Sequence, residues 1–177
     1  MQRSVGNTSQ SNNELQLKKK RSSPLKVSLQ AILVGGFGGF FTIFALSLIS
    51  WNDVALLMAP FGASCVLAFH VWDSPLSQPR NIIGGHFIST LVGLIVLNCF
   101  GNHAWTLALG VGLAIMMMIL TKTTHPPAGA DPIVVILAGS TWEFLFLPVL
   151  SGAILLSLLA YIFNNLQPNR KYPTFWV

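Results

Sequence analysis

The residues best suited to chemistry lie in a short polar stretch between two apolar segments. Residues 124–131 read Thr-His-Pro-Pro-Ala-Gly-Ala-Asp, so an imidazole and a carboxyl group flank two prolines. A residue before proline is pushed out of the α-helical region, whereas Pro127 fits the first turn of a helix because no N–H is needed there. The stretch therefore predicts a helix that is interrupted at His125 and restarts near Pro127, with its free N–H groups facing back toward the histidine. Such a restart at membrane depth is a place to bind an anion.

A second broken segment repeats this pattern. A shift of 67 residues, the separation of Pro60 from Pro127, places Pro-Phe-Gly-Ala-Ser of residues 60–64 on Pro-Ala-Gly-Ala-Asp of residues 127–131. Both segments contain Pro-x-Gly-Ala, and further apolar positions match at the same offset. We therefore expect two halves, each consisting of a long helix, a broken helix and a long helix. Inverted repeats with broken helices near the bilayer midplane are typical of transporters.

The two restarts predict a substrate site between them. Each helix start carries a partial positive charge of roughly half a unit, so two starts approaching from opposite sides would attract an anion. Ser64 and Thr124 would add hydroxyl donors, His125 could change charge near neutral pH, and Arg80 would act as an anion gate at the cytoplasmic mouth. The candidate substrate-binding residues are Pro60, Gly62, Ala63, Ser64, Arg80, Asn81, His86, Thr124, His125, Pro126, Pro127, Gly129, Ala130 and Asp131.

Three of these residues have more than one interpretation. Arg80 is either this gate or a flanking residue whose guanidinium extends to the membrane interface. His86 lies on a stripe with Gly85, Ser89 and Gly93, so it is either a structural hydrogen-bonding group or a functional one. Asp131 would compete with a bound anion. Its carboxyl group is therefore protonated, paired with Lys122 or His125, or turned away.

The composition places these elements in a membrane. Hydrophobic residues make up 53% of the 177 residues and charged residues 8%, against about 25% in a typical soluble domain. Only six charged residues lie between positions 27 and 169. We therefore predict an all-α integral membrane protein with six transmembrane segments, four long helices and two shorter proline-broken ones, in an inverted 3+3 repeat. The segments are residues 29–51, 54–69, 82–100, 104–121, 127–141 and 144–163.

The charged residues outside the apolar segments predict the domain limits and the topology. Residues 1–24 form a disordered basic tail, residues 25–166 the membrane domain with repeats at about 28–100 and 102–165, and residues 167–177 a C-terminal tail. The net charge of +5 indicates orientation rather than nucleic-acid binding. Six crossings would place both termini, Arg80 and Lys122 on the cytoplasmic side.

Three motifs resemble the HPP family of integral membrane proteins. They are Ala-Pro-Phe-Gly-Ala-Ser at 59–64, Ser-Pro-Leu-Ser-Gln-Pro-Arg-Asn at 74–81 followed by Gly-Gly-His at 84–86, and Thr-His-Pro-Pro-Ala-Gly-Ala at 124–130. The resemblance covers roughly residue 25 to the C-terminus. It implies membrane transport of nitrite, a role assigned to members in cyanobacteria and chloroplasts. It also implies a bacterial or cyanobacterial plasma membrane, or a chloroplast envelope in a eukaryote. Asp131 departs from the small or uncharged residue expected there.

The leading hypothesis is therefore that a homodimer in the lipid bilayer transports a small inorganic anion, with nitrite as the first candidate. The alternative is a non-transporting membrane subunit for assembly or sensing. We expect no enzymatic activity, no cofactor and no metal, because the histidine and acid spacings fit no H-E-x-x-H-like pattern. Cys65 and Cys99 fall in apolar runs and are expected to be buried free thiols.

Overall fold

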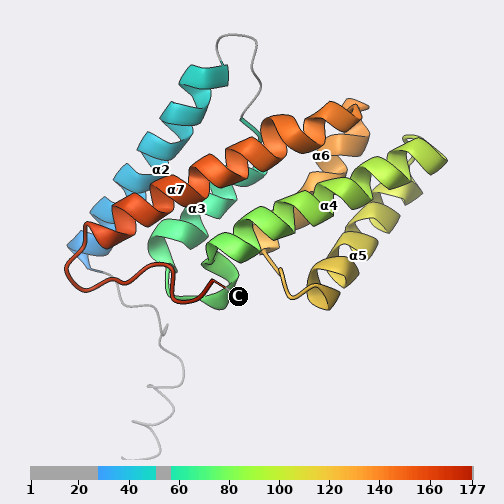
Figure 1. Cartoon of the computed structure of the whole chain (residues 1–177). Helices are drawn as coiled ribbons and strands as arrows, with labels where there is room; N and C mark the ends of the chain where they lie inside the picture. The colour runs from blue at the N-terminus through green and yellow to red at the C-terminus, as the bar shows by residue number, and fades with distance from the viewer. Residues whose placement is uncertain (1–27, 51–56, 177) are drawn as a thin grey trace, which may run out of the picture.

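The regular structure of this chain is helical wherever it is described. The computed structural model describes residues 28–50 and 57–176 (Figure 1). The helices are α2 (Leu29–Ser50), α3 (Pro60–His70), α4 (Pro79–Phe100), α5 (Ala104–Leu120), α6 (Asp131–Ala138) and α7 (Ser151–Asn165). Short turns join them: the 3-10 turns η1 (Pro75–Ser77), η2 (Pro126–Ala130) and η3 (Trp142–Leu145), and the π turn η4 (Phe146–Leu150). The all-α prediction is confirmed for these residues, whereas the N-terminal basic tail and residues 52–53, between the first two predicted segments, lie outside them.

Among the described residues, six apolar helical stretches lie where the sequence predicts six segments, and their ends agree with the prediction to within a few residues for most of them. Three are long and apolar enough to cross a membrane: Leu29–Ile49, Pro79–Phe100 and Trp142–Asn165. Three are shorter: Pro60–His70, Ala104–Leu120 and Pro126–Ala138. The long helix predicted at residues 104–121 is α5, whose 17 residues place it in the shorter group. The number of crossings and the inverted repeat remain predictions.

One end of the bundle gathers the helix termini that the charge pattern predicts to share a side. Gln30, near the start of α2, donates to Gln167 after α7 at 2.8 Å. Arg80, at the start of α4, donates to the carbonyl of Thr121 after α5 at 3.5 Å. These ends lie together at the lower side of Figure 1. Arg80 and the neighbouring Lys122 are therefore at the same end, as six crossings require.

Helix α4 packs its small-residue stripe against the second broken segment. A Cβ on Gly85 would lie 2.7 Å from Cβ of His125, and one on Gly93 would lie 2.8 Å from Cα of Pro132. The Ser89 hydroxyl donates to the carbonyl of Ala128. The predicted stripe is confirmed, and it brings the backbone of residues 123–132 into direct contact with α4.

The glycines of α2 agree with a predicted close packing at one of two positions. Gly35 and Gly39 form a small-xxx-small pair, which predicts close helix packing. A Cβ on Gly35 would meet nothing within 4 Å, whereas one on Gly38 would lie 2.6 Å from the Phe69 ring of α3. A Cβ on Gly39 would lie 3.8 Å from Cβ of Cys65, so α2 and α3 are in close contact at both Gly38 and Gly39.

The loop between α3 and α4 is held by its own side chains and by the C-terminal tail. Gln78 donates to the carbonyls of Ser74 at 2.8 Å and Trp72 at 3.0 Å. From the tail, the Tyr172 hydroxyl donates to the Ser77 carbonyl at 2.7 Å. This bonding fixes the backbone around η1, where a carbonyl contacts the functional cluster described next.

A second brace joins the tail to the end of α3. The Arg170 guanidinium donates to the carbonyl of Phe69 at 2.9 Å and lies over the Trp72 ring at 5.5 Å. Partial burial lowers the pKa of this guanidinium, and nearby Asp73 raises it. The tail is thus part of the folded bundle as far as Thr174, whose N–H donates to the Gln78 side chain at 2.8 Å.

Candidate functional site

Four buried polar side chains from four parts of the fold form one continuous chain of hydrogen bonds, here called the polar chain. They are Asp131 at the start of α6, His86 on α4, Ser64 on α3 and His125 just before η2. The links are Asp131 Oδ2 to His86 Nδ1 at 2.8 Å, His86 Nε2 to Ser64 Oγ at 2.9 Å, and Ser64 Oγ to His125 Nε2 at 2.8 Å. All four residues have 0% exposure. The polar chain ends where His125 Nδ1 contacts the Leu76 carbonyl at 2.8 Å.

Proline places Ser64 in the polar chain. Pro60 begins α3, because a proline at the first helical position lacks only an N–H that would have no partner. One turn later Ser64 projects from the same face as Pro60, whose carbonyl its hydroxyl reaches at 3.2 Å. Phe61 packs edge to face on the His86 ring at 5.1 Å. The first turn of α3 thus supplies both a hydroxyl group and an apolar wall.

The approach to His125 is set by the end of α5 and by the following proline. Lys122 has φ +57, and its N–H and that of Thr123 bond back to Ile119 and Met118, so the helix ends in a left-handed cap. His125 then has the extended conformation that a pre-proline residue favours, with φ −136 and ψ 103. The predicted interruption at His125 is confirmed. It turns the ring toward α3 and α4.

The restart differs from the predicted one in its hydrogen bonding. It begins as a 3-10 turn at Pro126, and the α-helix follows from Asp131. Pro126 and Pro127 have no N–H to offer. The N–H of Ala128 bonds to the His125 carbonyl at 3.0 Å, and that of Asp131 bonds to Ala128. The amide donors expected to face His125 are therefore largely used within the turn, and the donors that meet there are side chains.

The carboxyl group of Asp131 has a partner that the sequence did not suggest. It pairs with His86, and Thr90 donates to the same oxygen at a long 3.4 Å. Neither Lys122, which is exposed, nor His125 contacts it. The second oxygen, Oδ1, is buried without a hydrogen-bond partner. Asp131 is thus part of the polar chain rather than turned away from it.

The partners determine which atoms carry hydrogens when the polar chain is neutral. The Leu76 carbonyl can only accept, so His125 donates from Nδ1 and accepts at Nε2. Ser64 then donates to His125 and accepts from His86 Nε2. His86 Nδ1 is left as an acceptor, so the proton between His86 and Asp131 belongs to the carboxyl group. Shifting that proton to the ring gives an ion pair with the same number of protons.

The remaining candidate residues surround the polar chain or lie outside it. Asn81 is buried and donates to the Thr124 carbonyl at 2.9 Å, so Thr124 contributes its backbone there. Arg80 lies at the end of the bundle on Thr121. The exposed candidates are Gly62, Ala63, Pro126 and Ala130, Gly129 is half-buried with open space beside it, and Pro60 and Pro127 are buried.

Three residues that bond to the polar chain or to η2 were not predicted as site residues. The Leu76 carbonyl is backbone, and a backbone atom has no signature in the sequence. Thr90 follows Ser89, which lies on the small-residue stripe of α4, so Thr90 could have been considered with the residues of that helix. Ser89 was recognised only as packing, yet its hydroxyl bonds to η2.

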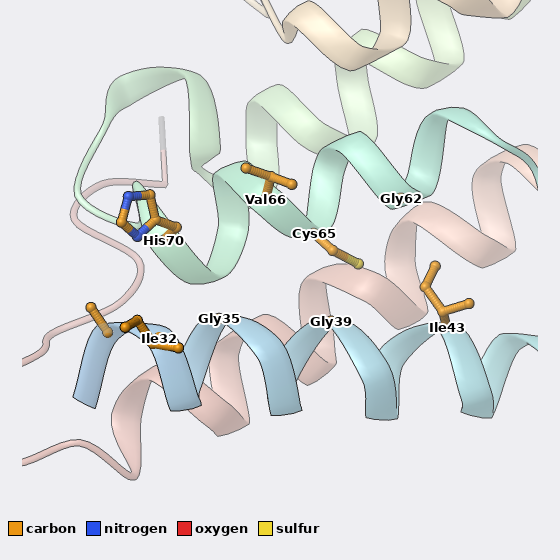
Figure 2. Close-up of a pocket in the computed structure, with 9 residues that line it drawn as sticks. Ile32, Gly35, Gly39, Ile43, Gly62, Cys65, Val66 and His70 are labelled. Atoms are coloured by element: carbon orange, nitrogen blue, oxygen red, sulfur yellow. The ribbon is translucent and has the colours of Figure 1, made fainter. Parts of the chain in front are cut away.

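A separate groove lies between α2 and α3. It has a volume of about 430 Å³ and is lined by glycine and apolar side chains of both helices, with His70 at one end (Figure 2). Gly62 faces this groove rather than the polar chain. Its lining offers few groups that could hold an anion. Among the described residues, no three His, Cys, Asp or Glu side chains are grouped so that they could hold a metal ion.

Known proteins similar to this chain are membrane proteins. The family described as "HPP, transmembrane region" matches residues 24–173. Two proteins of Dictyostelium discoideum, each described as a transmembrane protein, are both 37% identical to it, over 150 residues (77% of this chain and 53% of the relative) and over 167 residues (87% and 54%). The chain thus spans about half the length of these curated relatives, and no solved structure matches it. With a match over most of its length, the chain belongs to the HPP family of integral membrane proteins.

Proposed function

We propose that this chain transports a small inorganic anion across the membrane, with nitrite as the first substrate to test. The observation that carries the proposal is the bond between Ser64 and His125 at 2.8 Å, because it joins the first turn of α3 to the residue before η2. The two broken segments therefore meet at ionisable groups deep in an apolar bundle. Ionisable groups in that position are costly and commonly mark the path of a substrate or a proton.

The direction of the helices also supports an anion. From the meeting point α3 continues toward the end of the bundle that holds η1, while α6 continues toward the opposite end (Figure 1). The positive ends of both helix dipoles therefore face the polar chain. The N–H groups of both rings already donate within the polar chain, to Ser64 and Leu76, so the further positive contribution comes from Arg80 at the bundle end.

Nitrite is chosen because HPP proteins that the three motifs resemble are assigned its transport. The two Dictyostelium relatives are described only as transmembrane proteins, so they leave the substrate open. We also propose that the protein works as a homodimer with both termini of each subunit in the cytoplasm. The charge distribution supports the orientation, and the small size of one subunit supports the dimer.

The test is nitrite uptake into vesicles that contain the purified full chain. Uptake should be faster than in protein-free vesicles. His125→Ala and Arg80→Ala should abolish most of the difference. Ser157→Ala is the matched control, because Ser157 is a buried serine on α7 whose hydroxyl has no hydrogen-bond partner. Uptake equal to that of empty vesicles, with folded protein present, rejects the proposal.

A non-transporting subunit is the second candidate, and one observation favours it. The relatives are about twice as long as the matched region, so this membrane domain is joined to further chain in them. A subunit of this kind would co-purify with one partner in a fixed ratio and give no flux. A transporter would give flux without a partner.

A further inference from the structure

The polar chain has two complete hydrogen-bonding patterns that differ by one proton. In the neutral pattern the Ser64 hydroxyl donates to His125 Nε2 at 2.8 Å. The same hydroxyl also lies 3.2 Å from the Pro60 carbonyl, a second acceptor. When a proton from water binds to His125 Nε2, the Ser64 O–H turns to Pro60, and Ser64 Oγ accepts one N–H from each ring. No side chain has to change its position.

Every donor in the protonated pattern has a partner. The His125 ring donates from Nδ1 to Leu76 and from Nε2 to Ser64. His86 donates from Nε2 to Ser64 and accepts the Asp131 proton at Nδ1. One N–H bond forms on His125 as one O–H bond of a hydronium ion breaks, leaving water, so the site gains one positive charge.

No group that faces His125 can neutralise this added charge. Asp131 on α6 already shares its proton with His86 of α4, and α5 carries no titratable side chain. On α3, Cys65 faces α2, 3.8 Å from the Cβ position of Gly39. Tyr172 bonds to the loop at Ser77. Among the other charged residues, Arg80 and Lys122 are positive, and Asp73, in the loop that carries Leu76, acts on the Arg170 guanidinium.

A net positive charge inside an apolar bundle is strongly unfavourable unless a counter-ion binds with it. We propose that this site binds one proton and one monovalent anion together, with Ser64 as the positioning residue that rotates between His125 and Pro60. This inference depends on the proposed function and adds its coupling ion. Because binding linkage is reciprocal, the anion favours protonation of His125 as much as the proton favours the anion. Transport is then electroneutral, driven by the pH gradient and indifferent to membrane voltage.

The first measurement reads protonation directly and does not need transport. The full chain with ¹⁵N-labelled histidine is placed in lipid nanodiscs, and the ring nitrogen signals of its four histidines are followed against pH, with and without sodium nitrite. The neutral His125 signal should be that of the Nδ1–H form. Once the nitrite concentration is high enough to saturate the protonated site, each further tenfold increase should raise the midpoint of His125 protonation by about one pH unit. Ser64→Ala should lose most of this shift, and Ser157→Ala should keep it.

The second measurement counts protons and nitrite in the same vesicles. A pH dye inside the vesicles should report one proton for each nitrite taken up, after subtraction of the leak in protein-free vesicles. The rate of nitrite uptake should not change when a potassium gradient with valinomycin sets the membrane voltage.

The outcomes separate the two proposals. Nitrite flux that follows voltage, without proton uptake or a shift of His125, overturns the coupling and leaves anion transport standing. Neither flux nor shift rejects both proposals. An unchanged shift in folded Ser64→Ala overturns the role of Ser64. If that variant does not fold, Ser64→Cys, of similar size and weaker hydrogen bonding, replaces it, and the wild-type titration decides the coupling in either case.

Discussion

Changing Gly85 to alanine tests whether the contact between α4 and the broken segment holds the polar chain together. The added methyl group would lie 2.7 Å from Cβ of His125 and 2.9 Å from the Thr123 carbonyl oxygen. Ordinary van der Waals contact begins at about 3.4 Å, so His125 must move away from α4 by about 0.7 Å. Both atoms belong to the chain just before η2, and neither is the flexible end of a side chain.

The movement is large enough to break a hydrogen bond. His125 is held by two bonds of 2.8 Å, to Ser64 and to Leu76. A displacement of about 0.7 Å along either bond lengthens it to about 3.5 Å, beyond a useful hydrogen bond. Overpacking of this kind costs about 1–3 kcal/mol, offset by about 0.5–1 kcal/mol because alanine favours a helix more than glycine. We expect a modest loss of stability and a large loss of nitrite flux.

The assay compares Gly85→Ala with Gly112→Ala. Gly112 is an exposed glycine of α5, and a Cβ there would meet nothing within 4 Å, so this change carries the same gain in helix preference without the clash. Thermal unfolding in detergent and nitrite uptake in vesicles are measured for both variants. Gly112→Ala should be as stable as the wild type or more so, and as active. If Gly85→Ala matches it in both measurements, the close contact is not what positions His125.

Four further substitutions, at three positions, test single features of the structure by thermal unfolding. Asp131→Asn should change the free energy of unfolding by no more than about 1 kcal/mol, because the amide can donate to His86 as the protonated carboxyl group does. Asp131→Leu should lower the free energy of unfolding by roughly 2–5 kcal/mol, because it leaves the buried acceptor on His86 without a partner. A large loss for the asparagine variant would contradict the assigned hydrogen positions. Tyr172→Phe removes the hydroxyl that donates to Ser77 and should cost about 1 kcal/mol, or roughly 2–4 °C in Tm. Lys122→Gly should raise Tm by a similar amount, because φ +57 is unfavourable for lysine by about 1 kcal/mol; an unchanged or lower Tm would argue that the lysine side chain compensates.

The sequence predicts features whose cause is local. The break at His125 follows from the two prolines, which act on their immediate neighbours. The stripe of Gly85, Ser89 and Gly93 follows from helical periodicity, which predicts a close contact without naming its partner. The composition predicts a helical membrane protein, because so few charges cannot cover a soluble surface. These features could be derived before any tertiary contact was known.

Pairings across helices could not be derived in this way. His86 and Asp131 are 45 residues apart in the sequence, and their contact depends on the axial register between α4 and α6. Nothing in the spacing within either helix sets that register. The Leu76 carbonyl is equally hidden, because its position is fixed by side chains of the loop and of the C-terminal tail. The use of the first amides within η2 was missed because a 3-10 turn satisfies them one residue earlier than an α-helix does.

The carboxyl group of Asp131 appears in the sequence as an obstacle to an anion site, and the polar chain removes that obstacle. A bare carboxylate beside the two helix starts would repel an anion. The Leu76 carbonyl cannot donate, so every hydrogen bond in the neutral polar chain runs from Asp131 toward η1, and the carboxyl group begins the series as a donor. In that state Asp131 presents no net charge and orients His86, which in turn orients Ser64 toward His125. The acid is therefore compatible with anion binding, and it supplies the fixed direction that leaves His125 as the group free to accept the next proton.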